Sequence, residues 1–339
     1  MRVLLIKMSS MGDVFHTFPA LSDALQAMPN IKVDWVVEKT FAEIPKWHPA
    51  VDKVYPIELR EWRKSLFKGE TRRQVRAFFE EINQTSYDLI LDAQGLYKSV
   101  WVGRRIQGAI SGFDLKSARE PLASLFYQRK FSVEKSQHAI LRLRLLFAQA
   151  LGYELPQGQP IYYGLQTELW NRPEALPWSS ENYLVCLHGT TWATKYWPEE
   201  NWYQLLRKAV ESGLKVVLPW GNDEEKLRSL RLKADLSDKD VWVPERMLTL
   251  NEMAALLKNA NAVVSVDTGL SHVAAALDVP LLVLYRVTDP ELVGADGPKV
   301  ARLVSPLASQ YIKNFSGDQE RLSLQNIGVP EVEKWLEDV

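Results

Sequence analysis

MRVLLIKMSSMGDVFHTFPAL, residues 1–21, is the stretch that decides the fold of this chain. Residues 3–6 form an unbroken apolar run, which is typical of a parallel strand covered on both faces. Phe15 and Phe18 then begin a three- to four-residue apolar spacing, so a helix is expected to start close to Asp13. A strand that turns directly into a helix is the opening of a doubly wound α/β fold.

Asp13 has two interpretations. Small residues at Ser9, Ser10 and Gly12 fit a tight turn at the carboxyl end of the strand, where ligands bind in open α/β sheets. Asp13 would then face a substrate. An Asp before an apolar-periodic helix is also a common N-cap, and the residues of this stretch leave both roles open.

Length and composition indicate an ordinary globular protein with two domains. The chain has 339 residues, of which 46% are apolar and 24% charged. No apolar run approaches the roughly 20 residues that cross a bilayer, and the run after Arg2 ends at Lys7, too short for a signal peptide. We therefore expect a cytoplasmic protein, with the single cysteine, Cys186, as a reduced core residue.

Charge is distributed unevenly along the chain. Residues 1–160 contain 23 Lys and Arg against 17 Asp and Glu, whereas residues 161–339 contain 18 against 25. The first half thus favours an anionic ligand or a membrane surface, although a solvated helix face explains a basic run equally well. Residues 117–130 add an apolar stripe between basic ends, which suits an amphiphile or packing on a core. The densest basic run consists of Arg60, Arg63, Lys64, Lys68, Arg72, Arg73 and Arg76.

Strand and helix patterns alternate in both halves, which predicts parallel sheets with helices on both faces. The strand pattern fades after about residue 300, and a last helix follows Pro330. Pro and Gly mark residues 161–182 as an interdomain linker. Candidate strands cover residues 3–6, 33–37, 53–57, 88–91, 183–187, 215–218, 262–266 and 281–285, and candidate helices include residues 74–82 and 138–151.

One polar loop of the second half follows a buried strand directly. Asp267, Thr268 and Gly269 lead into a helix whose first amides lack helical partners and that also carries Ser271 and His272. Such amides and hydroxyls suit a pyrophosphate, but a capped helix with a buried histidine needs the same residues.

Two further polar loops follow strands in that half. Thr190, Thr191 and Lys195 supply hydroxyls and a phosphate counter-charge, unless Lys195 is an ordinary surface lysine. Residues 219–225 supply carboxylates for ribose hydroxyls, or acidic residues that favour a helix N-terminus. Because the three loops follow strands of one domain, we predict a nucleotide site there.

Several chemistries lack their signatures. The chain has neither the glycine-rich dinucleotide fingerprint nor a P-loop, and its five histidines show no metal-ligand spacing. We therefore expect no cofactor, no obligatory metal and no nucleic-acid partner.

Motifs from both halves resemble the bacterial lipopolysaccharide heptosyltransferase I family. They are K-x-S-S-M-G-D-V-x-H-T-x-P-A-L, A-R-E-P-L-A-S-L-F-Y-x-R-K, T-T-x-x-x-K-x-W-P-E-E-x-W and S-V-D-T-G-L-S-H, and the similarity spans residues 1 to about 290. The resemblance implies a GT-B fold with two facing Rossmann-like, doubly wound domains and a cleft between them. It assigns residues 1–160 to an acceptor-binding domain, 161–182 to the linker, 183–315 to a nucleotide-sugar-binding domain and 316–339 to a C-terminal helix crossing back to the first domain.

The resemblance also implies a reaction. The family moves L-glycero-D-manno-heptose from ADP-heptose to the first Kdo of Kdo2-lipid A, with inversion and without a metal, at the cytoplasmic face of the inner membrane. Asp13 is then the general base, Glu225 or its neighbour Glu224 binds ribose, and Met247 lies near the adenine. The implied donor-phosphate ligands are Thr190, Thr191, Lys195, Asp267, Thr268 and Gly269, with His272 beside them. The implied acceptor ligands are Ser9, Ser10, Gly12, Arg60, Arg63, Lys64 and Arg119.

One loop departs from the family pattern. Arg286 and Val287 stand where the pattern Tyr-Gly-Pro-Thr-Asp-Pro has Gly and Pro, which changes the accessible backbone angles beside the donor. The donor preference can differ accordingly. Two alternatives to the family reaction are a related GT-B transferase that adds a later core sugar and a sugar-nucleotide-binding module without turnover.

Overall fold

The computed structural model describes residues 1–65, 67–155, 158, 160–178 and 182–339. Residues 179–181 of the predicted linker and residue 66 of the basic run lie outside the described residues. Contacts divide the chain into two compact units, Met1–Gln166 and Thr167–Val339, so the division falls within the segment expected to be a linker.

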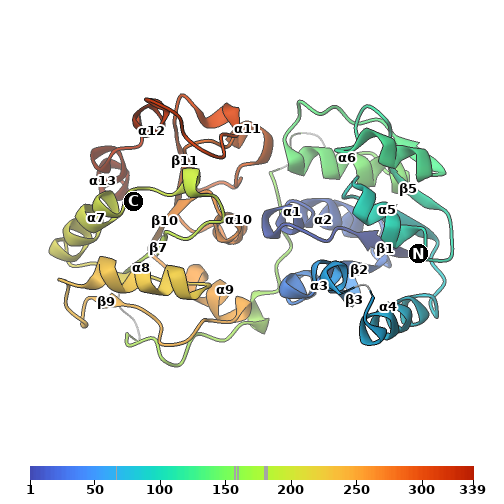
Figure 1. The fold of residues 1–339 in the computed structure, drawn as a ribbon, viewed down its shortest axis with the longest axis horizontal. Helices are drawn as coiled ribbons and strands as arrows, with labels where there is room; N and C mark the ends of the chain where they lie inside the picture. Colours follow the sequence, from blue (N-terminus) through green and yellow to red (C-terminus); the bar gives the residue numbers. More distant parts are fainter. Residues whose placement is uncertain (66, 156–157, 159, 179–181) are drawn as a thin grey trace. The chain divides into compact units, whose positions relative to one another are not determined.

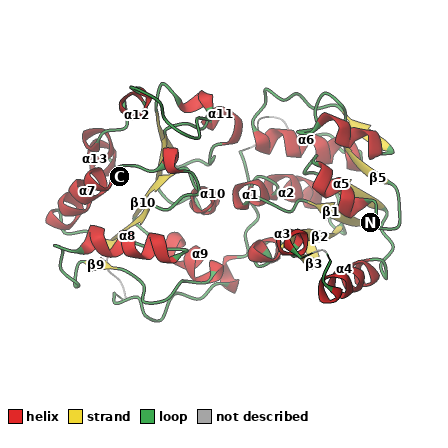
Figure 2. Cartoon of the chain, viewed as in Figure 1, coloured by secondary structure: helices red, strands yellow, loops and turns green. Residues whose placement is uncertain are grey.

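The first unit contains a six-stranded parallel sheet in the order β3-β2-β1-β4-β5-β6. Helices flank the strands (Figure 1, Figure 2). Its elements are β1 (Arg2–Ile6), α1 (Met11–Phe15), α2 (Phe18–Ala27), β2 (Lys32–Glu38), η1 (Lys39–Phe41), η2 (Ile44–Trp47), β3 (Val51–Ile57), α3 (Leu59–Lys64), α4 (Gly69–Ile82), β4 (Leu89–Asp92), α5 (Tyr97–Gly103), β5 (Ile110–Phe113), η3 (Pro121–Phe126), β6 (Arg129–Phe131) and α6 (Ala139–Leu151).

Strand β1 is the centre of this sheet. It pairs with β2 through Val3 and Val33 and with β4 through Val3 and Leu89. Val3 to Ile6 are fully buried, because helices cover both faces, as the unbroken apolar run predicts. The helix expected at residues 138–151 is also confirmed: α6 ends before Gly152, whose positive φ of 79° closes it.

The second unit repeats this architecture with the sheet order β12-β11-β10-β7-β8-β9. This is the same topology as in the first sheet, because β7 to β12 correspond in chain order to β1 to β6. Its elements are η4 (Thr167–Leu169), β7 (Tyr183–Leu187), η5 (Ala193–Lys195), α7 (Glu199–Glu211), β8 (Lys215–Val217), α8 (Asp223–Lys233), β9 (Val241–Trp242), α9 (Leu250–Lys258), β10 (Ala262–Val266), α10 (Gly269–Ala276), β11 (Leu281–Tyr285), α11 (Pro290–Val293), β12 (Val300–Val304), η6 (Ala308–Gln310), α12 (Gln319–Leu322) and α13 (Val329–Glu337).

The core of the second unit lies between its sheet and helices such as α7. Trp197 and Trp202 pack edge to face in it, with ring centroids 5.1 Å apart. Cys186 is fully buried in β7, and burial raises the pKa of its thiol, so the expected core role is confirmed. Each unit therefore has its own hydrophobic interior.

Three features differ from the sequence-based expectation. Strands β5, β6, β9 and β12 were not predicted. β5 contains Ser111 and Gly112, β6 and β9 are three and two residues long, and β12 is an edge strand with a central Arg302. The first helix is split into α1 and α2. The C-terminal helix, expected to cross to the first domain, belongs to the second unit: Val332 of α13 joins that unit's core.

Candidate active site

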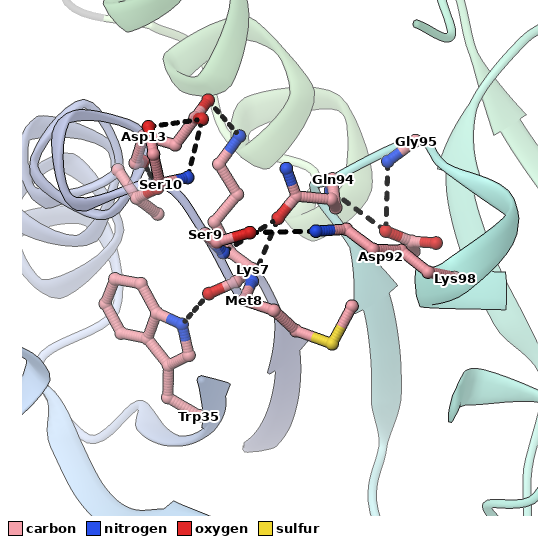
Figure 3. A network of polar contacts seen from close by, with 11 residues as sticks. Lys7, Met8, Ser9, Ser10, Asp13, Trp35, Asp92, Gln94, Gly95 and Lys98 are labelled. Carbon is pink, nitrogen blue, oxygen red and sulfur yellow. Dashed lines mark hydrogen bonds and ion pairs between the residues drawn. The ribbon is translucent and has the colours of Figure 1, made fainter. Parts of the chain in front are cut away.

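Asp13 is the third residue of α1, the helix that follows β1. Its Oδ1 accepts a hydrogen bond from Lys7 Nζ at 3.1 Å, and its Oδ2 accepts from the Ser10 amide at 2.8 Å and from the Ser10 hydroxyl at 3.1 Å (Figure 3). Ser10 precedes the helix, so Asp13 is not the N-cap that one interpretation expected; it reaches back to the N-cap amide. The Asp13 side chain is 25% exposed, which leaves it accessible to a ligand.

The surroundings of Asp13 fix its charge. Burial alone would raise the pKa of Asp13. The Lys7 ammonium, His16 and the Ser10 amide lower it by more than burial raises it, so the pKa lies well below its usual value. Lys7 is itself only 7% exposed in its side chain. Asp13 is therefore an ionised carboxylate held next to a buried cation.

The loop after β4 supports the loop that carries Asp13. Gln94 Oε1 accepts hydrogen bonds from the amides of Met8, at 2.9 Å, and Ser9, at 3.2 Å. Asp92 Oδ1 in turn accepts from the Gln94 and Gly95 amides at 2.9 and 3.1 Å (Figure 3). Strand order in the first sheet reverses between β1 and β4, and this is the ligand-binding position of open α/β sheets.

Lys98 of α5 is a second cation next to this loop. Its Nζ donates to Ser9 Oγ at 2.8 Å (Figure 3). Burial lowers the pKa of Lys98, and Glu38, Arg60, Asp13 and Arg119 act on its charge at longer range. Two expected acceptor ligands, Arg60 and Arg119, thus lie near the residues that hold Asp13.

The other expected acceptor ligands have different surroundings. Gly12 is buried inside α1. Arg63 and Lys64 are exposed on α3, which the buried Trp62 anchors, and Lys64 forms an exposed ion pair with Glu61 at 2.8 Å. No contact in the described residues brings Arg63 or Lys64 to Asp13.

In the second unit, Lys195 and Asp267 form an ion pair. Lys195 Nζ lies 2.5 Å from Asp267 Oδ2, with side chains 17% and 9% exposed. Lys195 ends η5, in the loop after β7, and Asp267 follows β10. Since β7 and β10 are neighbours at the reversal of strand order, this pair occupies the same topological position as Asp13 in its own sheet.

Backbone contacts join the same two loops. Thr190 Oγ1 donates to the Asp267 carbonyl at 2.9 Å, and the Tyr196 hydroxyl donates to the Thr190 carbonyl at 2.7 Å. Thr191 is exposed beside Thr190. These two hydrogen bonds thus fix the loop of residues 190–196, which contains Lys195, against the Asp267 backbone.

The segment after β10 leads directly into α10. Thr268 has an extended backbone before the helix, and Gly269 is the first helical residue. Ser271 Oγ donates to the Thr268 carbonyl at 2.6 Å, and His272 is buried in the first turn. The first amides of α10 therefore lie beside the Lys195 and Asp267 pair, where a diphosphate oxygen would find hydrogen-bond donors.

The structure distinguishes Glu225 from Glu224. Glu225 Oε2 accepts from the Gly221 amide at 2.8 Å, while Glu224 is exposed. The Glu225 carboxylate also packs against Gly189: a Cβ at Gly189 would lie 2.5 Å from Glu225 Cδ. Glu225 thus borders the loop that contains Thr190. Met247, after β9, is 56% exposed.

Arg286 points into the protein. Its Nε and Nη2 donate to Ser323 Oγ at 3.1 and 2.6 Å, its Nη1 donates to the Tyr196 carbonyl, and its guanidinium lies 4.8 Å from the Phe315 ring centroid. Burial lowers the pKa of Arg286 to about 10. The residue that departs from the family pattern therefore ties the loop after β11 to the loop that carries Lys195.

The sequence did not single out Lys7, and it indicated Gln94 and Lys98 only as members of a polar loop at a strand end. Which side chains of residues 92–98 contact Met8 and Ser9 depends on the pairing between β1 and β4, which the sequence does not show. Among residues the structure describes, no group of three or more His, Cys, Asp or Glu side chains could hold a metal ion. No helix within the described ranges combines the length and apolar character needed to cross a membrane.

Comparisons with known proteins agree with one family. Lipopolysaccharide heptosyltransferase 1 of Pseudomonas aeruginosa is 50% identical over 306 residues, covering 90% of this chain and 84% of that protein. The solved E. coli heptosyltransferase WaaC with ADP superimposes with a TM-score of 0.88 at 42% identity, covering 100% of this chain and 99% of that one. The same enzyme with ADP-2-deoxy-2-fluoro heptose gives a TM-score of 0.86 at 42% identity and the same coverage.

The two units agree with the two-domain GT-B fold of these relatives. The family model of glycosyltransferase family 9 (heptosyltransferase) matches residues 75–320, which include most of the second unit and part of the first. This chain belongs to glycosyltransferase family 9, the heptosyltransferases.

Proposed function

We propose that this chain transfers L-glycero-D-manno-heptose from ADP-heptose to the first Kdo of Kdo2-lipid A in lipopolysaccharide inner-core synthesis, with inversion. The observation that carries the proposal is Asp13, a partly exposed, ionised carboxylate at the strand-order reversal of the first sheet. Relatives named lipopolysaccharide heptosyltransferase 1, and a relative solved with an ADP-heptose analogue, support the substrates.

The second unit would bind the donor. Lys195 and the first amides of α10 would hold the diphosphate, with Asp267 and Thr190 keeping Lys195 and its loop in position. The hydroxyl of Thr191 and the ring of His272 would border the same site. Glu225 would accept hydrogen bonds from ribose hydroxyls, and the exposed Met247 would contact the adenine.

The first unit would bind the acceptor and deprotonate it. As the acceptor oxygen forms its bond to the anomeric carbon, Asp13 takes the hydroxyl proton and the bond to ADP breaks, with the electron pair leaving on the diphosphate. A single displacement of this kind inverts the anomeric centre. Ser9, Ser10, Arg60 and Arg119 would orient the anionic acceptor.

The departing ADP gains negative charge, and the Lys195 ammonium can stabilise it together with backbone amides. We therefore expect turnover to proceed without added metal. Dialysis against a chelator should leave the rate unchanged, and a requirement for a divalent cation would contradict this part of the proposal.

We further propose that the chain binds peripherally to the cytoplasmic face of the inner membrane. Leu122, Leu125 and Phe126 of η3 are exposed by 54, 63 and 40%, and the Arg104 guanidinium lies 5.1 Å from the Phe126 ring centroid. Apolar side chains beside a cation suit a surface of anionic lipid. The protein should co-sediment with anionic vesicles. Loss of this co-sedimentation when Leu122 and Leu125 are changed to Ser would assign the membrane contact to η3.

Product analysis tests the reaction. The chain is incubated with ADP-heptose and Kdo2-lipid A, and mass spectrometry and NMR define the added sugar and its anomeric configuration. One heptose added with inversion is the expected product. Preference for an already heptosylated acceptor would favour addition of a later core sugar, and calorimetric binding of ADP-heptose without product would favour a binding module.

A further inference from the structure

Lys98 is a half-buried cation that the proposed reaction has not yet used. Its Nζ donates to Ser9 Oγ at 2.8 Å, and Ser9 is itself 5% exposed. Figure 3 shows Lys98 approaching Ser9 from the side of the β4 loop, while Lys7 approaches Asp13 from β1. Two ammonium groups therefore border one short loop, and only that of Lys7 contacts Asp13.

The surroundings of Lys98 leave its charge without a close counter-ion. Among the described residues, no carboxylate forms an ion pair with Lys98, and its side-chain hydrogen bond goes to the neutral Ser9 hydroxyl. Glu38 and Asp13 attract its charge from farther away, and Arg60 and Arg119 repel it. With Lys7 included, this group of six side chains has an excess of positive charge. A desolvated ammonium in such a place is costly unless an anion joins it.

The loop geometry connects Lys98 to Asp13. Ser9 holds Lys98 through its hydroxyl, and the next residue, Ser10, holds Asp13 through its amide and hydroxyl. The Ser9 amide is in turn fixed by Gln94 Oε1 at 3.2 Å. A ligand hydroxyl that reaches Asp13 would therefore bring neighbouring substituents of the same sugar toward Lys98.

We propose that Lys98 binds the carboxylate of the acidic acceptor sugar, beside the hydroxyl whose proton Asp13 takes. The inference rests on the proposed function, because it needs an acceptor that carries a carboxylate and a reactive hydroxyl on one ring. Lys98 makes the acceptor site selective for an acidic sugar, since a neutral sugar would leave the ammonium unpaired. The phosphates of lipid A are also anions that an ammonium can bind. The test therefore includes an acceptor without these phosphates.

The experiment pairs a change in the enzyme with a change in the acceptor. Wild type, K98M and K98R are assayed with Kdo2-lipid A, with its Kdo methyl esters and with a dephosphorylated form. For Kdo2-lipid A, K98M should lower kcat/KM by about 10- to 100-fold, mainly through the acceptor KM, as expected for a lost charge-assisted hydrogen bond, and K98R should recover part of it. With the methyl esters, wild type and K98M should differ by less than about 3-fold.

Two results would overturn the inference. An equal K98M defect with free and esterified acceptors would mean that Lys98 only supports the Ser9 loop. A defect that disappears with the dephosphorylated acceptor would assign Lys98 to a phosphate. K32M, which removes an exposed lysine at the amino end of β2, is the matched control and should behave as wild type.

The proposed function fails separately. If wild type adds no heptose to Kdo2-lipid A, both proposals are wrong, whereas an active wild type with a carboxylate-independent K98M defect rejects only the role of Lys98. Thermal unfolding followed by circular dichroism shows whether each variant keeps the fold of the first unit, which contains Lys98 and Lys32.

Discussion

Lys7 Nζ lies 3.1 Å from Asp13 Oδ1, so the carboxylate proposed as the general base is paired with a buried ammonium. This contact keeps Asp13 ionised at neutral pH and fixes the direction of its side chain. It also makes Asp13 a weak base, so transfer of the acceptor proton would accompany bond formation to the sugar instead of preceding it.

Replacing Lys7 with Met should shift the pH dependence of turnover. The pKa of Asp13 is lowered in the folded protein, so its ionised form persists to acid pH. Without Lys7 this pKa rises, so on lowering the pH the variant should lose activity earlier, at a higher pH than wild type. The acid limb of the profile of kcat/KM against pH should therefore shift to higher pH. An H16Q variant identifies any contribution of His16, the other side chain whose charge lowers the pKa of Asp13. An unmoved acid limb in K7M would contradict control of Asp13 by Lys7.

Asp13→Asn keeps the shape of the side chain but removes the base. Turnover should fall by about 100- to 10,000-fold, the usual contribution of a general base, while the Kd for ADP-heptose stays within a few-fold. Single-turnover kinetics and calorimetry measure the two quantities. Asp52→Asn, at the start of β3, is the control. Wild-type turnover in D13N would reduce Asp13 to a residue that stabilises the start of α1.

Neutralising Arg60, Arg63 and Lys64 together should raise the acceptor KM without changing the donor KM. All three belong to α3, and Arg60 acts on the charge of Lys98. The effect should diminish as salt concentration rises, because exposed charges attract an anionic acceptor at long range. Changing Lys32, Lys46 and Lys53 to Gln removes the same charge elsewhere in the first unit. Equal effects on donor and acceptor would argue against an acceptor surface on α3.

Lys195 and Asp267 allow binding and stability to be separated. Lys195→Met should weaken ADP binding by about 10-fold or more and also destabilise the fold, because Asp267 becomes a buried charge without its partner. Adding Asp267→Asn should restore much of the Tm but not the affinity. Thermal unfolding and calorimetry report the two effects. If the double variant regained ADP affinity, Lys195 would have only a structural role.

Gly189→Ala should displace Glu225. The new Cβ would lie 2.5 Å from Glu225 Cδ, too close for the present arrangement. ADP should then bind more weakly, while an analogue without ribose hydroxyls binds G189A and wild type alike. Glu225→Gln should show the same discrimination, and Glu224→Gln, at the exposed neighbour, should not. Equal losses for both nucleotides would exclude a ribose contact for Glu225.

Local patterns were sufficient for the elements that carry strong signals. Residues 3–6 indicated a buried central strand, Gly152 indicated the end of a helix, and the loop at Asp267 indicated a polar turn between strand and helix. In each case the information lies within about ten residues, because apolar period and capping chemistry are local.

Long-range contacts account for what the sequence did not predict. Lys98 meets Ser9 across 89 positions, and Gln94 meets Met8 across 86, so their roles depend on the pairing of β1 with β4. Strand β6 has three residues and is stabilised by β5 instead of by its own pattern. The inward direction of Arg286 similarly depends on Ser323, 37 positions away.

The central position of β1 has a consequence for synthesis of the chain. β1 is made before its partner β4, which follows 86 positions later, as the pairing of Val3 with Leu89 shows. Until β4 leaves the ribosome, one edge of a strand whose residues 3–6 are all apolar has no native partner, and such an edge readily pairs with other chains. The nascent first unit is therefore most vulnerable to aggregation before residue 92 has emerged, and a chaperone that covers β1 should increase the yield of folded protein.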